Sequence, residues 1–245
     1  MWARERIGKM TAKIRYRLLT IDLDETLWPC TPTILQAEAA LHTWLERCAP
    51  RLTDACDQDV MRVHRRDVAA RRPEIAHDLT QVRLESLRGL LAAYGYDVAL
   101  ADQAMSLFLE QRNRVEPYAD VIPGLRALGA NRRLVSVTNG NADVRRTPLS
   151  DLIHFSLTAA DVGAQKPDPA MFLGALKWAK TPPDRTLHLG DDPYLDVEAA
   201  RRLGMQAVWV NRSGKPWPDE LAPPTVEVAD LVELRRWLEE FDGAF

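Results

Sequence analysis

The nine residues from Leu18 to Thr26 constrain the fold more than any other part of this 245-residue chain. They begin as an apolar run typical of a buried strand and then present two carboxylates, Asp22 and Asp24. Side chains alternate along an extended chain, so both carboxylates are expected on the same side. Two like charges at the end of a buried strand need a cation, a shared proton or a chemical role. The simpler alternative is that residues 24–26 only cap the following helix.

Three later segments repeat this pattern of a short apolar run that ends in polar or small residues, and helical patterns lie between them. Strands that alternate with helices predict an α/β fold, with a Rossmann-like parallel sheet core and helices on both faces. Functional residues of such folds gather at the carboxyl ends of the strands. The expected later strands are 133–137, 186–189 and 207–210, and the expected helices are 120–128, 169–179, 194–203 and 230–241.

Residues 33–115 interrupt this alternation, because they contain helical spacing of apolar residues and no clear strand. We therefore expect two domains: an α/β catalytic core from residues 1–32 and 116–245, and an all-helical cap domain inserted after the first strand, from residues 33–115. The insert departs directly from the Asp22 loop and is expected to sit over it.

Composition excludes several classes of function. The formal net charge of −3 gives no basic field for nucleic acid, and no apolar run reaches the length of a membrane span. The three cysteines form no CxxC pair, which favours a reducing, cytoplasmic location. The basic N-terminal segment lacks an apolar block and so does not resemble a secretory signal, and either Met1 or Met10 can be the start. A monomer and a homodimer are both compatible with the sequence.

Polar side chains that follow the predicted strands form a candidate site. Carboxylate oxygens without histidine or cysteine partners favour a hard cation, Mg²⁺ before zinc. A carboxylate beside such an ion, together with a lysine and a hydroxyl, suits a phosphoryl group. Besides Asp22 and Asp24, the residues concerned are Thr138, Asn139, Lys166, Asp191, Asp192 and Asp196.

In this order and spacing, the chain resembles the haloacid dehalogenase superfamily, with the helical insert in the position of that superfamily's cap. The resemblance implies that Asp22 attacks phosphorus, forming an aspartyl phosphate. It implies that Asp24 protonates the leaving oxygen and then deprotonates water. Thr138 would hydrogen-bond the phosphoryl group, and Lys166 would balance charge.

The same resemblance implies Mg²⁺ as the cofactor. The ion would be held by Asp22, by the backbone carbonyl of Asp24 and by Asp191, with Asp192 or Asp196 close by. Members that displace halide from carbon lack the second aspartate, so Asp24 favours a phosphatase over a dehalogenase. The insert contains no lysine, which argues against phosphonate cleavage by a Schiff base.

Segments 73–80, 138–141 and 188–192 look like the bacterial flavin-pathway phosphatases. These hydrolyse 5-amino-6-(5-phospho-D-ribitylamino)uracil and flavin mononucleotide (FMN), so a small-molecule phosphate ester is the expected substrate. Nucleotide and sugar phosphatases are the alternatives within the superfamily, and a haloacid dehalogenase or a non-catalytic phosphoacceptor is a remote one. Trp28 could stack on a planar ring, or only close the interface between cap and core. Glu74 and His77 are candidates, with Asn139, for binding the substrate.

Overall fold

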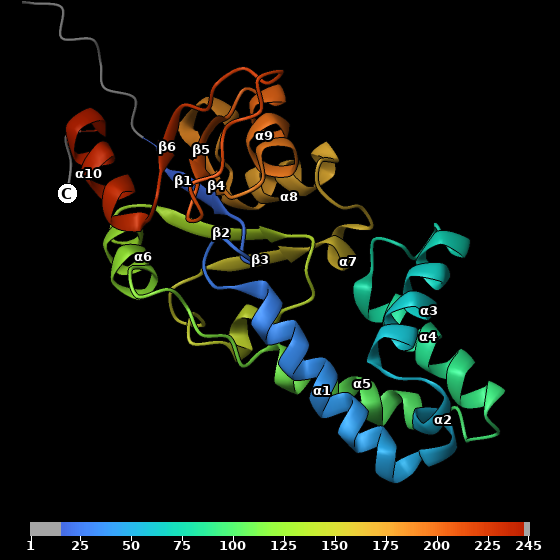
Figure 1. Cartoon of the computed structure of the whole chain (residues 1–245). Helices are drawn as coiled ribbons and strands as arrows, with labels where there is room; N and C mark the ends of the chain where they lie inside the picture. The colour runs from blue at the N-terminus through green and yellow to red at the C-terminus, as the bar shows by residue number, and fades with distance from the viewer. Residues whose placement is uncertain (1–15, 243–245) are drawn as a thin grey trace, which may run out of the picture.

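The strands form one six-stranded parallel sheet in the computed structural model, which describes residues 16–242 (Figure 1). The strand order is β3-β2-β1-β4-β5-β6, so β1 lies between β2 and β4. The residues that follow these three strands therefore lie close together, at the carboxyl ends of the strands. The α/β fold class is thereby confirmed. The strands are β1 (Leu18–Ile21), β2 (Arg133–Thr138), β3 (Phe155–Thr158), β4 (Thr186–Gly190), β5 (Gln206–Val210) and β6 (Val226–Val228).

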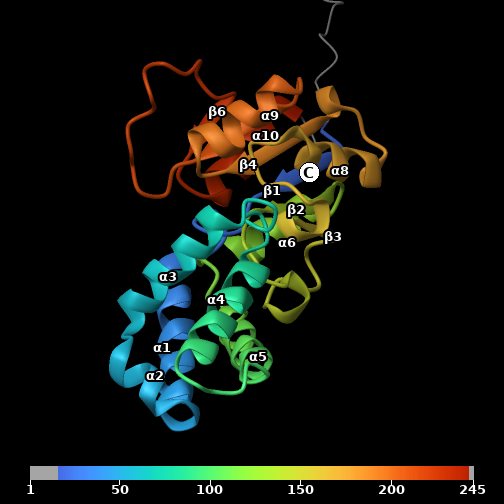
Figure 2. The ribbon, with the colours of Figure 1, turned by 90° about the vertical axis from the view of Figure 1, so that its right-hand side faces the viewer.

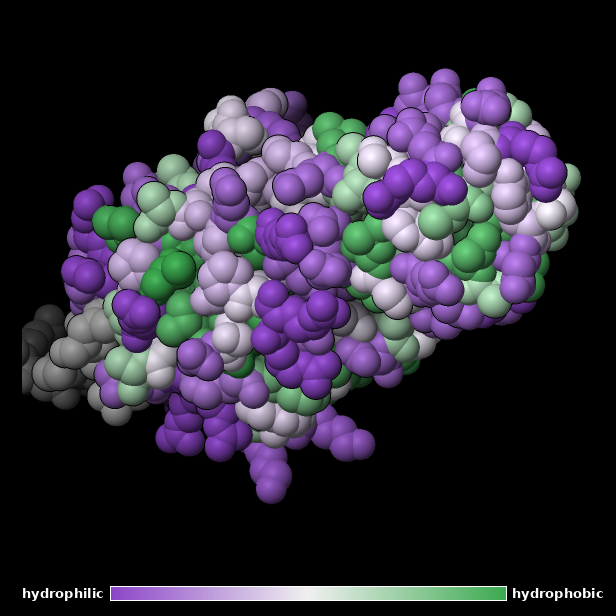
Figure 3. Space-filling model, turned by 90° about the horizontal axis from the view of Figure 1, so that it is seen from below, coloured by the Kyte–Doolittle hydropathy of each residue, from purple (hydrophilic) through white to green (hydrophobic). Residues whose placement is uncertain are grey.

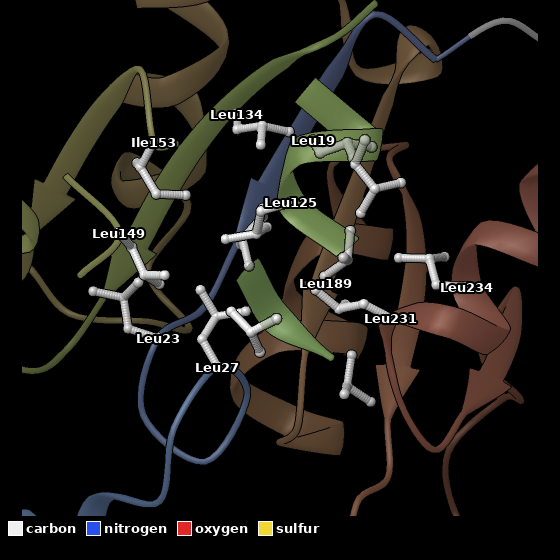
Figure 4. Close-up of a cluster of buried hydrophobic side chains, with 14 of the residues drawn as sticks. Leu19, Leu23, Leu27, Leu125, Leu134, Leu149, Ile153, Leu189, Leu231 and Leu234 are labelled. Carbon is white, nitrogen blue, oxygen red and sulfur yellow. The ribbon is translucent and has the colours of Figure 1, made fainter. Parts of the chain in front are cut away.

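Helices cover both faces of the sheet, because its central strands are apolar on both sides. Leu19 of β1 faces the core beneath α6 (Val121–Gly129) and α10 (Leu231–Asp242), which is shown in Figure 4. Leu18 faces the opposite core, beneath α8 (Pro169–Ala179) and α9 (Ala199–Arg202). Neighbouring residues of one strand thus pack into different cores, as a period of two requires.

Five helices between β1 and α6 pack together beyond the sheet (Figure 1, Figure 2). They bury a core of their own, in which Leu45, Leu91 and Phe108 meet. We call α1 to α5 the helical segment. Its domain boundaries at residues 33 and 115 stay a prediction. Its helices are α1 (Cys30–Cys48), α2 (Pro50–Ala55), α3 (Gln58–Arg71), α4 (Leu79–Ala93) and α5 (Leu100–Arg112).

The structure contains short elements that the sequence pattern did not predict. Strands β3 and β6 form the two edges of the sheet and have only four and three residues, with little full burial and no long apolar run. The helix expected over 194–203 begins instead as a π-helical turn, η3 (Pro193–Glu198), and continues as α9. The remaining short elements are α7 (Ala159–Val162) and the 3₁₀ turns η1 (Val144–Arg146) and η2 (Pro183–Arg185).

The loop after β1 is not a simple helix cap. Helix α1 begins only at Cys30, so residues 24–26 lie outside its first turn. Glu25 has a φ of 62° and its Oε1 accepts hydrogen bonds from the N–H groups of Cys30 and Thr31. The side chains of Asp24 and Thr26 can therefore bind other residues.

No helix within the described residues has the length and apolar character of a membrane span. On the face seen from below, apolar side chains form small patches among polar ones (Figure 3). The basic N-terminal segment and the two candidate start residues lie outside the described part of the chain.

Candidate active site

Asp22, Lys166 and Asp196 form a buried ion cluster at the carboxyl end of β1. Lys166 Nζ donates to Asp22 Oδ1 at 2.5 Å and to Asp196 Oδ1 at 2.6 Å. Burial raises the pKa of Asp22 well above its ordinary range, although Lys166 opposes this. Burial has the opposite effect on the pKa of Lys166, which it would lower, but the negative charges of Asp196 and Asp22 hold this pKa above its ordinary value. The lysine is therefore a permanent cation shared by two carboxylates.

Asp196 is the ionised partner in this cluster. Burial opposes its charge, but Lys166 and His188 hold the pKa of Asp196 below its ordinary value. His188 Nε2 donates to Asp196 Oδ1 at 3.1 Å, and its Nδ1 accepts from the Thr20 hydroxyl at 2.9 Å. The π-helical turn η3 places Asp196 against Gly190. A Cβ added to Gly190 would lie 2.2 Å from the Asp196 carboxyl carbon. Only glycine fits this approach.

Asp191 lies on the other side of Asp22, with Thr26 between them. The Thr26 hydroxyl is 3.2 Å from Asp22 Oδ2 and 3.3 Å from Asp191 Oδ1, and its single proton can be given to one oxygen at a time. Burial and the nearby Asp196 raise the pKa of Asp191 to about 7. Among residues 16–242, Asp191 forms no ion pair with a cationic side chain, although Lys166 opposes the rise of its pKa.

This arrangement fits a divalent cation. One oxygen from each of Asp22, Asp191 and Asp196 lies within 4.8 Å of the others. With only the Lys166 ammonium against three carboxylates, two negative charges are unbalanced when all are ionised. All donors are oxygens, as Mg²⁺ prefers. Asp192 stands apart, since its Oδ1 accepts from the N–H groups of residues 194 and 195 and caps η3.

The Asp24 carboxylate has partners different from those of Asp22. Arg112 Nη2 donates to Asp24 Oδ1 at 2.7 Å and to Oδ2 at 2.6 Å, and the Trp28 indole donates to Oδ1 at 2.8 Å. Asp22 and Asp24 thus share no hydrogen-bond partner among residues 16–242, and their common side stays a prediction. Arg112 was missed by the sequence analysis.

Thr138 is the last residue of β2, and Asn139 follows it. The Thr138 side chain is buried, and its Oγ1 accepts from the Gly140 N–H at 2.9 Å. Both ends of the Asn139 amide bind the backbone of Lys166, donating to its carbonyl at 3.0 Å and accepting from its N–H at 2.7 Å. Asn139 thus holds the lysine loop in place, a role that the sequence analysis did not assign to it.

A cavity of about 550 Å³ opens next to Asn139 and Gly140. His77 and Thr80 of the helical segment line it, and Asn141 Nδ2 donates to the Thr80 hydroxyl at 3.2 Å across it. His77 and Asn139 thus line one cavity, whose lining does not include Asp22, Asp24 or Lys166.

Two predicted substrate residues are placed differently. Glu74 is exposed, pairs with Arg72 and does not line the cavity. Trp28 is fully buried, so it presents no open ring face and instead closes the contact between the segment and the sheet.

The comparisons with known proteins agree with this geometry. Residues 16–204 match the family model described as haloacid dehalogenase-like hydrolase. The chain belongs to this family. Among curated family relatives, it is 33% identical over 228 residues to 5-amino-6-(5-phospho-D-ribitylamino)uracil phosphatase YigB of Escherichia coli, covering 90% of this chain and 95% of the relative. It is 36% identical over 142 residues to a Thermus thermophilus phosphoserine phosphatase, covering 55% and 56%.

A solved haloacid dehalogenase-like structure is also similar. The protein described as 2-haloacid dehalogenase from Pseudomonas syringae pv. Tomato superposes with a TM-score of 0.85 and 39% identity, covering 92% of this chain and 99% of that one. Phosphatases and a protein described as a dehalogenase are therefore both among the relatives of this hydrolase.

Proposed function

We propose that this hydrolase is a Mg²⁺-dependent phosphomonoesterase of small phosphorylated metabolites. One observation carries the proposal: Asp22, the expected nucleophile, accepts from the Lys166 ammonium and has an oxygen within 4.8 Å of Asp191 and Asp196, while Asp24 is bound by Arg112. A hydrolase that attacks phosphorus needs this division of labour between a nucleophile and an acid.

The reaction proceeds in two halves. An Asp22 carboxylate oxygen bonds to phosphorus as the ester P–O bond breaks, and the leaving oxygen keeps the electron pair and takes the proton held by Asp24. The Asp24 carboxylate then removes a proton from water, which attacks the aspartyl phosphate and regenerates Asp22. Lys166 offsets the negative charge of the phosphoryl oxygens, and we assign the Thr138 hydroxyl to donating a hydrogen bond to them.

The residues that would hold Mg²⁺ are Asp22, Asp191 and the backbone carbonyl of Asp24. When bound, the ion neutralises the charge that develops on the phosphoryl oxygens. Asp196 is engaged by Lys166 and His188, so we assign it to holding the lysine and to completing the negative field rather than to direct binding. Asp192 serves the turn that carries Asp196.

We propose residues 33–115 as the cap domain and the 550 Å³ cavity as the substrate site. The relative that hydrolyses 5-amino-6-(5-phospho-D-ribitylamino)uracil supports this compound, or FMN, as the substrate. The cavity supports the same class, because the Thr80 and Asn141 side chains in its lining can hydrogen-bond the hydroxyl groups of a polyol chain; charged residues, among them Asp143 and Arg145, line it as well. A cytoplasmic location and a monomeric or homodimeric state stay predictions.

Dehalogenation is the second candidate, because a solved structure with that description is 39% identical. Halide leaves carbon without a proton and without a metal. Dehalogenation would therefore give no chemical role to the Asp24–Arg112 pair or to the Asp22–Asp191 pair, whose negative charge is unbalanced. The acidic cluster therefore favours the phosphatase.

A kinetic screen tests the proposal. We expect turnover of an aryl phosphate and of several phosphorylated metabolites, the ribitylaminouracil phosphate and FMN among them, and no halide release from a 2-haloacid. Chelation of the metal and Asp22→Asn should each abolish turnover. The matched control is Asp184→Asn, an exposed residue at the opposite end of β4, which should retain full activity. Retained turnover by Asp22→Asn with its metal present would refute the mechanism.

A further inference from the structure

We propose that Arg112 is a positioning residue for Asp24 and that it makes the acid step depend on how the helical segment is seated. The inference rests on the proposed function, which gives Asp24 its role. One nitrogen of Arg112 bridges both oxygens of the Asp24 carboxylate, at 2.7 and 2.6 Å. Trp28 holds Oδ1 from a second direction. These contacts fix the rotation of the carboxyl group.

Arg112 has no other evident task in the described part of the chain. Its side chain is 1% exposed, and within residues 16–242 its Nε and Nη1 have no hydrogen-bond partner. A buried guanidinium costs several kcal/mol unless it is paired. An arginine placed only for stability would be expected to satisfy more than one nitrogen. Its single anionic partner is Asp24, so the contact with Asp24 explains its position.

The two donors to Asp24 come from the two chain connections of the helical segment. Trp28 lies just before α1, and Arg112 is the last residue of α5. Helices α1 and α5 pack along each other, and Asn113 Oδ1 accepts from the Asp143 N–H at 2.8 Å, which ties this end of α5 to the sheet domain. The orientation of the Asp24 carboxyl is thus set where the segment joins the sheet. A change in the seating of α5 would release it.

Correct placement of Asp24 matters most when the leaving group is poor. An alkyl alcohol leaves slowly unless its oxygen receives a proton as the P–O bond breaks, whereas a nitrophenolate leaves without one. Loss of Arg112 should therefore slow alkyl esters far more than aryl esters. A role in substrate binding would raise KM for both, and a role in folding would lower both rates alike.

The test compares kcat/KM, which covers the steps up to P–O cleavage, for p-nitrophenyl phosphate and for a primary alkyl phosphate that the wild type hydrolyses. Arg112→Met should lose about 100-fold on the alkyl ester, as for a misplaced catalytic group, and less than about 5-fold on the aryl ester. Arg112→Lys should recover part of the loss, and added guanidinium ion should partly restore Arg112→Ala. The matched control is Arg114→Met, because Arg114 is exposed and pairs with Glu110.

Asp24→Asn, measured in parallel, separates this inference from the proposed function. If Asp24→Asn lowers kcat/KM equally for both esters, Asp24 is not the acid and the acid–base mechanism of the proposed function fails. Asp24→Asn can instead leave kcat/KM for the aryl ester nearly unchanged, as expected for the acid. If Arg112→Met then lowers kcat/KM equally for both esters, or for neither, only the role of Arg112 is overturned. Should Arg112→Met not fold, Arg112→Lys gives the same comparison, and an equal loss on both esters would overturn the role.

Discussion

Replacing Asp191 by asparagine should stabilise the metal-free protein at alkaline pH while removing its activity. Burial and Asp196 raise the pKa of Asp191 from an ordinary 3.8 to about 7, so its charged form is disfavoured in the folded state. Asparagine has nearly the same shape and no charge. Its Oδ1 can still accept the hydrogen bond that Thr26 now gives to Asp191 Oδ1.

The magnitude follows from this pKa. The folded state binds a proton at Asp191 that the unfolded chain has released, so the free energy of unfolding falls as pH rises from 3.8 to about 7. A difference of about 3 pKa units at about 1.4 kcal/mol each gives about 4 kcal/mol above pH 7. Asp191 is not fully buried, and solvent screening reduces this value. We expect Asp191→Asn to gain about 2–4 kcal/mol at pH 8 and little near pH 4.

Urea denaturation of the metal-free proteins, followed between about pH 4 and 8, measures this gain. Asp184→Asn, at an exposed position, controls for the loss of one negative charge from the whole molecule. The gain of Asp191→Asn must grow with pH, whereas that of the control must not. If Asp191→Asn is equally or less stable than the wild type at pH 8, the uncompensated charge that we infer at this site does not exist.

Three further predictions concern the same site. Mg²⁺ should raise the melting temperature more at pH 8 than at pH 6, because below pH 7 protons compete for Asp191; calorimetry measures this, and Asp191→Asn should show no such shift. Lys166→Met leaves Asp22 buried without its ammonium and should cost about 3–5 kcal/mol in urea denaturation at pH 8, with an unchanged midpoint contradicting the ion cluster. Gly140→Ala would place a Cβ 2.5 Å from Asp24 Oδ2; we expect about 10–100-fold lower kcat/KM on alkyl phosphates, and full activity would contradict the observed packing.

Sequence reasoning predicted the end of the sheet where the site lies because β1, β2 and β4 are short segments rich in Leu, Val and Ile, each followed by polar residues. Once these strands are parallel neighbours, the residues after them must converge, whatever the loops between them do. Strands β3 and β6 were missed because tertiary pairing, not a local pattern, makes three or four half-buried residues extended.

The partners within the site could not be predicted in the same way. Arg112 and Arg114 look alike in the sequence, yet one is buried against Asp24, 88 positions away, and the other pairs on the surface with Glu110. Asn139 suited a substrate ligand by position, but its amide matches the backbone of Lys166. Such contacts depend on where distant segments meet, and a single sequence contains no direct signal for that.

Asp22 and Asp24 both follow β1 and are separated by only one residue. They differ because their surroundings differ. Asp22 shares a lysine with Asp196 and faces Asp191, so its environment is short of positive charge by the amount that a divalent cation supplies. Asp24 has a guanidinium to itself. A cation bound near the Asp22 carboxylate therefore need not compete with Arg112 for the Asp24 carboxylate.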